Sequence, residues 1–209
     1  AAWNEKRGKE LLWKKGWKLN SFFSTPRDKM TWLKFQHRTL YTVGHSKTED
    51  TSCRACSDRE SQLHLISCSV IYEELWKKVF HFLNDLGMPD PENEIDFLIT
   101  GQVSDTTMVH ADFKGVIDIA FRCLYAAITE SRIDSTPIDL EAAYKRLISM
   151  VASRLNADGE KWLAWVSAGR HHSKDRMIPE KHQAKSLMFF EEDGSYTLHD
   201  AVKNEHKKT

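Results

Sequence analysis

Apolar residues recur every three or four positions over several long stretches, and this spacing predicts a mostly helical protein. In residues 69–87 a wide apolar stripe marks one face of a helix, which Gly87 and then Pro89 should end. Residues 113–132 are apolar on nearly every side, which predicts a central, buried helix. Residues 135–159 predict another long helix, which opens at Thr136-Pro137 and closes at Gly159.

Two further helices are predicted toward the N-terminus. Residues 24–41 carry a clear start signal, because Thr25 can cap the helix, Pro26 suits its first position and Asp28 follows three residues after the cap. Residues 4–20 also predict a helix, although Gly8 and Gly16 weaken its pattern. Residues 88–105 read as an acidic connector, and residues 160–170 as a shorter helix.

The C-terminal pattern is different. Asp193-Gly194 stands between two short β-prone runs, which predicts a hairpin over residues 188–198. The sequence thus divides into three segments: a basic helical segment with a cysteine cluster (1–87), a helical domain (88–169) and a tail that contains the hairpin (170–209).

Charge is spread unevenly along the chain, although 30 basic and 30 acidic residues give a net charge of zero. Residues 1–47 hold eleven Lys or Arg against three acidic residues, whereas residues 84–118 hold one Lys against eight. Only the N-terminal quarter therefore has the charge for a nucleic-acid partner, and a solvated helix surface explains the same charges. No apolar run approaches the roughly 20 residues that cross a membrane, so no transmembrane segment is predicted.

Three of the four cysteines and one histidine gather within sixteen residues, in the stretch CRACSDRESQLHLISC. A tight turn can direct Cys53 and Cys56 to one point, while His64 and Cys68 would share a face of a helix that begins near Glu60. Zinc prefers four tetrahedral Cys or His ligands, so we predict one zinc ion on this set. Because protein fills all four positions, the predicted role is structural. A Cys53–Cys68 disulfide and ordinary core cysteines are the alternatives.

The fourth cysteine, Cys123, lies in the predicted buried helix and reads as an inert core thiol. Together these patterns predict a mostly α fold: a helical domain with an inserted CCHC zinc knuckle and a small C-terminal β-hairpin.

An ordered series of residues surrounds the cluster between about residues 25 and 80. It consists of Trp32, His37, Leu40, Thr42, Cys53, Cys56, Glu60-Ser61, His64-Leu65, Cys68 and Trp76. This series resembles the zinc-binding region found C-terminal to the reverse transcriptase of non-LTR (LINE-type) retrotransposons. That family has a Trp and an apolar helix, a His-x-x-Leu-x-Thr-like element, Cys-x-x-Cys, Glu-Ser or Glu-Thr, His-Leu, Cys and a further Trp.

The resemblance implies an intracellular module that lies beside a polymerase and helps it to grip template RNA or target DNA. It implies no catalysis by this chain, which has neither a Tyr-x-Asp-Asp motif nor an endonuclease set, and no small-molecule substrate. Phosphate contacts would come from the basic residues of the N-terminal face. These are Lys14, Lys15, Lys18, Arg27, Lys29, Lys34, Arg38 and Arg54.

A second reading of the sequence is a domesticated copy that serves as a structural subunit of a large assembly. The zero net charge, the acidic middle and the seven Trp residues favour protein partners.

Overall fold

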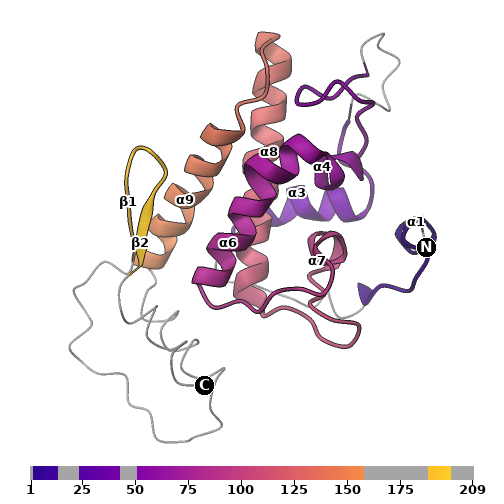
Figure 1. Cartoon of the computed structure of the whole chain (residues 1–209), viewed down its shortest axis with the longest axis horizontal. Helices are drawn as coiled ribbons and strands as arrows, with labels where there is room; N and C mark the ends of the chain where they lie inside the picture. Colours follow the sequence, from indigo (N-terminus) through magenta and orange to yellow (C-terminus); the bar gives the residue numbers. More distant parts are fainter. Residues whose placement is uncertain (1, 14–23, 43–50, 158–187, 199–209) are drawn as a thin grey trace, which may run out of the picture. The chain divides into compact units, whose positions relative to one another are not determined.

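The computed structural model describes residues 2–13, 24–42, 51–157 and 188–198 (Figure 1). These residues form helices, one two-stranded hairpin and a Cys–His cluster, which confirms the predicted mostly α class. Residues 1–144 make one compact unit and residues 145–209 a second. The division into three segments stays a prediction. None of the described helices is long and apolar enough to cross a membrane.

The two N-terminal helices differ in how well the sequence predicts them. Helix α3 (Pro26–Gln36) begins with the predicted cap, because the Thr25 hydroxyl accepts from the Asp28 amide and the Thr25 amide donates to the Asp28 carboxylate. Helix α1 (Ala2–Arg7) is shorter than the predicted helix over residues 4–20. It ends before Gly8, whose φ of 65° lies in the left-handed region that glycine adopts freely. Residues 14–20 lie outside the described residues.

The predicted helix over residues 69–87 is present as a nearly continuous run with a wider turn inside it. It comprises α5 (Ser69–Ile71), a π-helical turn η2 (Tyr72–Trp76) and α6 (Lys77–Asp85). The run ends at Asp85, and the predicted stop residue Gly87, with a φ of 100°, follows two residues later. Its apolar stripe is fully buried, including Leu75, Trp76 and Val79.

Helix α7 (Glu94–Thr100) corrects the prediction of a connector. Asn93 caps it by accepting from the Asp96 amide, and Gly101 ends it with a φ of 80°. A seven-residue helix shows too little periodicity to be recognised. It is held by tertiary hydrogen bonds, since Trp32 and Gln36 of α3 donate to its backbone carbonyls at 3.1 and 2.8 Å.

Helix α8 (Ala111–Asp134) is the predicted central helix. Helix α3 packs against it, and the rings of Phe35 and Phe121 lie 4.6 Å apart. The Trp76 ring lies 4.9 Å from the same Phe121 ring. Aromatic pairs at this separation add stabilisation beyond the area that they bury.

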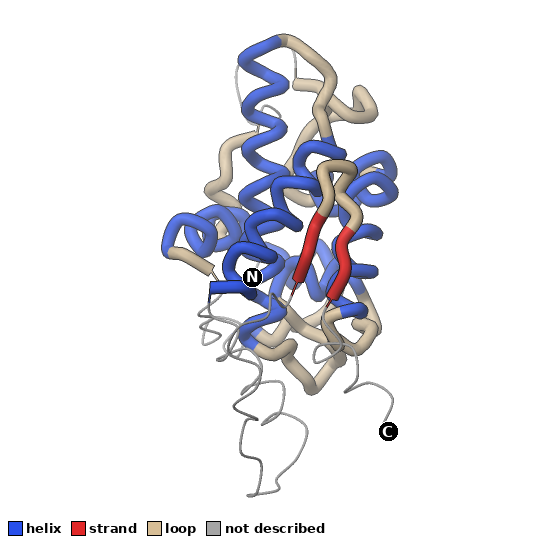
Figure 2. Tube along the Cα trace, turned by 90° about the vertical axis from the view of Figure 1, so that its left-hand side faces the viewer, coloured by secondary structure: helices blue, strands red, loops and turns tan. Residues whose placement is uncertain are grey.

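The last described helix and the hairpin also match the prediction. Helix α9 (Leu140–Ala157) buries Leu147, Ile148, Val151 and Leu155. Strands β1 (Met188–Phe190) and β2 (Tyr196–Leu198) pair antiparallel, with Met188 opposite Leu198 (Figure 2, red). The helix predicted over residues 160–170 lies outside the described residues.

Candidate metal centre

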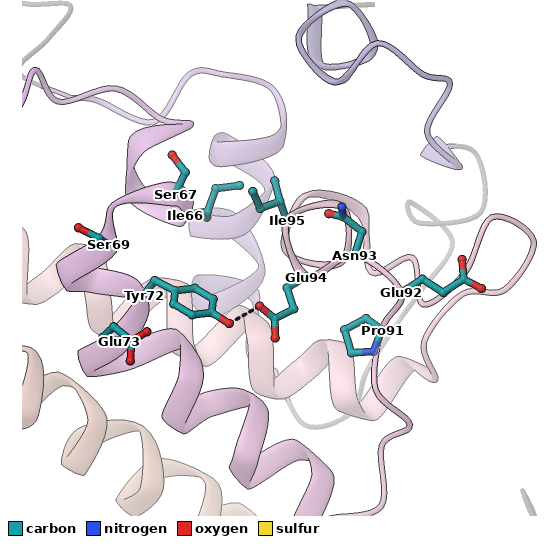
Figure 3. Close-up of a pocket in the computed structure, with 10 residues that line it drawn as sticks. All are labelled: Ile66, Ser67, Ser69, Tyr72, Glu73, Pro91, Glu92, Asn93, Glu94 and Ile95. Atoms are coloured by element: carbon teal, nitrogen blue, oxygen red, sulfur yellow. Dashed lines mark hydrogen bonds between the residues drawn. The ribbon is translucent and has the colours of Figure 1, made fainter.

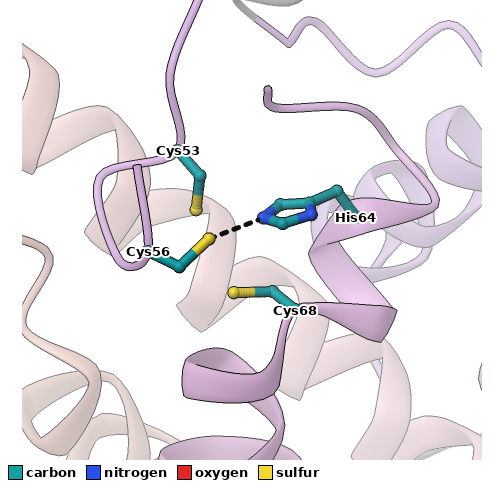
Figure 4. A group of neighbouring side chains, drawn as sticks. All are labelled: Cys53, Cys56, His64 and Cys68. Atoms are coloured by element: carbon teal, nitrogen blue, oxygen red, sulfur yellow. Dashed lines mark hydrogen bonds between the residues drawn. The ribbon is translucent and has the colours of Figure 1, made fainter. Parts of the chain in front are cut away.

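The side chains of Cys53, Cys56, His64 and Cys68 converge on one point (Figure 4). Their ligand atoms all lie within 4.8 Å of one another, and the Cys56 sulfur is 3.2 Å from Nε2 of His64. Three sulfur atoms and one imidazole nitrogen at these separations could hold one metal ion. All four cysteines of the chain are free thiols, so the alternative of a Cys53–Cys68 disulfide is not realised.

A tight turn presents the first two cysteines, as the two-residue spacing predicts. The Ser57 amide donates to the Cys53 carbonyl at 2.9 Å, and the Cys53 amide donates to the Asp58 carbonyl. Ser57 itself has a φ of 68°, in the left-handed region that some turn residues adopt. The Ala55 amide donates to the Cys53 sulfur at 3.4 Å, and such a donor favours the thiolate that binds a metal.

The other two ligands are placed differently from the expectation. Helix α4 (His64–Ser67) starts at His64 rather than near Glu60, and Cys68 lies just beyond its last residue in an extended conformation. The Ser61 hydroxyl accepts from the His64 amide, and the Cys68 amide donates to the His64 carbonyl at 2.7 Å. One helical turn is enough to bring His64 and Cys68 together, so the error in the helix start leaves the cluster intact.

Three contacts tie the cluster to the helical core. The Glu60 carboxylate, which is 1% exposed, pairs with Arg132 near the end of α8. The buried Gln62 side chain donates to the Leu40 carbonyl at 2.6 Å. Beyond the cluster, the indole N–H of Trp76 donates to the Leu65 carbonyl at 2.9 Å. The ligands are therefore held on both sides by contacts that do not involve a metal.

The Arg132 partner of Glu60 was not recognised from the sequence. It stands 72 residues further along the chain, and no local pattern links the two residues.

The surroundings of Cys53 and Cys56 disfavour the thiolate form of these two side chains. Burial and the neighbouring thiols raise the pKa of Cys56 to about 12. Burial likewise raises the pKa of the Cys53 thiol, against the lowering effect of backbone amides that donate to it. A divalent cation at the centre of the cluster would reverse this balance, because it is the largest local charge and deprotonates a coordinating thiol. Cys123, in contrast, is a core thiol of α8 that is 1% exposed and does not belong to this cluster.

The predicted phosphate-binding residues are only partly gathered on one surface. Arg27, Lys34 and Arg38 are exposed, and the first two lie seven residues apart on the outer face of α3. Lys29 and Arg54 are half-buried. The remaining predicted residues, Lys14, Lys15 and Lys18, lie outside the described residues.

Part of the basic N-terminal charge is neutralised inside the molecule. Arg7 and Lys9 both pair with the buried Asp96 carboxylate at 2.8 Å. Asp96, from the acidic stretch 84–118, thus partners the basic segment from inside the same unit. Counting the charges of residues 1–47 therefore overstates the positive charge that an external partner could contact.

A second feature is an acidic cavity of about 580 Å³ between residues of α4–η2 and those of α7 (Figure 3). Its lining includes Glu73, Glu92 and Glu94. The Tyr72 hydroxyl donates to Glu94 at 2.5 Å, and this hydrogen bond raises the pKa of Tyr72 to about 12. A cavity of this charge repels phosphate.

Comparisons with known proteins do not link this site to any family. The chain matches no protein-family model, no curated protein and no solved structure. Its likeness to the retrotransposon zinc-binding region therefore rests on the ordered residues around the cluster.

Proposed function

We propose that this chain is a non-catalytic zinc-binding module, similar to the region C-terminal to LINE-type reverse transcriptases, that binds RNA or DNA through a basic N-terminal face. The observation that carries the proposal is the convergence of Cys53, Cys56, His64 and Cys68 within 4.8 Å. Three Cys and one His form a standard structural zinc set, and four protein ligands leave no open position for an activated water. The zinc would hold the fold.

Exposed cations on α3 support the nucleic-acid part of the proposal. Arg27 and Lys34 lie on the outer face of this helix, and Arg38 follows just after its end. Cations on one face can neutralise successive phosphates of a strand and release their counterions. The Glu-lined cavity on another part of the same unit would keep the strand away from that region.

The test is the salt dependence of binding to a labelled single-stranded oligonucleotide, followed by fluorescence anisotropy. The Arg27→Gln/Lys34→Gln variant should lower the salt slope by about 0.7 for each lost phosphate contact. The matched control is Lys77→Gln/Lys78→Gln, which removes the same charge from α6, where both lysines pair with glutamates. Binding no tighter than about 10⁻⁴ M at physiological salt, or equal slopes for the two variants, would contradict the proposal.

A structural subunit of a larger assembly is the second candidate function. Met30 and Leu33 lie on the same outer face of α3 and are 49% and 39% exposed. Methionine and arginine together are typical of protein interfaces. If this candidate holds, Met30→Ser/Leu33→Ser should release the chain from a co-purifying protein complex without lowering its thermal stability, while oligonucleotide binding stays weak.

A further inference from the structure

A cavity of about 290 Å³ lies beside the metal-ligand cluster and is built from three separate parts of the chain. Lys6 comes from α1, and Arg38 follows the end of α3. Arg59, Ser61 and Gln62 come from the segment between the second and third metal ligands. Sequence reasoning named only Arg38 among these cations, because nothing local links the other two to it.

The charge of this cavity is positive. Lys6, Arg38 and Arg59 are all exposed, and neither Lys6 nor Arg38 has an ion-pair partner among the described residues. Glu60 also lines the cavity, but its carboxylate pairs with Arg132 of α8. Three cations that converge on a space of this size suit a group with concentrated negative charge, and arginine suits phosphate best because its fork of donors matches phosphate oxygens.

A buried polar group gives a second, independent indication of a ligand. Gln62 is 3% exposed; its amide nitrogen donates to the Leu40 carbonyl, whereas its Oε1 has no hydrogen-bond partner among the described residues. Buried acceptors normally find a donor in the protein, in water or in a ligand. A nucleotide unit provides such donors, as sugar hydroxyl or base N–H groups, next to its phosphate.

We propose that this cavity binds one backbone phosphate of a single-stranded nucleic acid, with Arg38, Arg59 and Lys6 as its contacting cations. The inference rests on the proposed function and deepens it, because it moves a phosphate contact from the open face of α3 into a formed cavity. It also gives the metal a role in binding. One wall of the cavity, residues 59–63, runs between Cys56 and His64, so a metal ion on these ligands would hold that wall in place.

The experiment compares Arg38→Gln/Arg59→Gln with the charge-matched control Lys77→Gln/Lys78→Gln, using the full chain and a labelled single-stranded oligonucleotide. Loss of two charge-assisted contacts to this phosphate should weaken binding by at least about tenfold, and loss of the one phosphate contact should lower the salt slope by about 0.7. The control should bind like the wild type. If the double variant folds poorly, Lys6→Gln tests the same cavity from α1, and it should weaken binding while lowering the salt slope by at most about 0.7.

The outcomes separate this inference from the function on which it rests. Tight oligonucleotide binding by the wild type, with the cavity variants indistinguishable from the control, overturns the cavity inference and leaves nucleic-acid binding standing. Absence of binding by the wild type overturns both. A selective loss in the cavity variants, with the control unaffected, supports the inference.

Discussion

The segment Thr51–Leu63 and helix α8 are held in place by different forces. Within Thr51–Leu63 the buried side chains are Cys53, Glu60 and Gln62, none of which is a large apolar group. Helix α8 instead buries apolar side chains along most of its length, each worth about 1.5–3 kcal/mol. Burial alone can therefore hold α8. Under the proposed function, the segment Thr51–Leu63, called the knuckle below, depends instead on its metal ligands and on its few polar anchors.

The largest expected effect comes from removing one ligand. Cys56→Ala should expose the amides of residues 51–68 to hydrogen exchange, because the binding energy of a structural zinc, about 10–16 kcal/mol in zinc-finger peptides, is folding energy. Amides in the middle of α8 should stay protected, since apolar burial holds them. Hydrogen exchange followed by mass spectrometry resolves the two regions.

The control for this change is Cys123→Ala, which removes a thiol from α8 instead. It should cost about 1 kcal/mol and leave residues 51–68 protected. Native protection of residues 51–68 in the Cys56 variant would show that the ligands do not hold the knuckle.

A smaller effect is expected from an ion pair inside α8. Lys114 and Asp118 are 5% and 0% exposed and lie 2.8 Å apart. Burial lowers the pKa of Lys114 and raises that of Asp118, so each charge depends on the other. Asp118→Ala should lower the free energy of unfolding by about 3–5 kcal/mol, measured in urea, without changing the metal content.

The double variant Lys114→Met/Asp118→Leu sharpens this test. It should recover most of the lost stability, because it leaves no unpaired charge in the core. Loss of bound metal from either variant would mean that the two regions are not held independently.

The smallest of these effects concerns the link between the two regions. Glu60→Gln should lower the free energy of unfolding by about 2 kcal/mol, because it replaces a charged hydrogen-bond partner of Arg132. Metal content should not change. The control Glu73→Gln alters an exposed pair with Lys77 and should cost less than about 0.5 kcal/mol. Equal effects of the two changes would show that the buried pair does not anchor the knuckle.

Local patterns predict much of this molecule. The helices α3, α6, α8 and α9, the hairpin and the convergence of the three Cys and one His all follow from spacings of a few residues. The predicted cap at Thr25 is also present. Features that depend on residues far apart in the sequence could not be predicted from local spacing. Helix α7 is held by side chains of α3, which lie more than 60 residues earlier in the chain.

The prediction of where α4 starts and the interpretation of the charge distribution were wrong for the same reason. Glu60 extends toward Arg132 instead of opening a helix, and Asp96 neutralises Arg7 and Lys9 from nearly 90 residues away. Long-range pairs leave no periodic signal in the sequence, so a charge count over a segment cannot tell an internal partner from an external one.

The most direct test of the central claim is metal analysis combined with X-ray absorption at the zinc edge, on protein purified without added metal. We expect about one equivalent of zinc with three sulfur ligands at about 2.3 Å and one nitrogen at about 2.0–2.1 Å. Cys123→Ala should keep this signal, and Cys56→Ala should lose the intact coordination. Protein without zinc, or a Cys53–Cys68 disulfide found by mass spectrometry, would contradict the account.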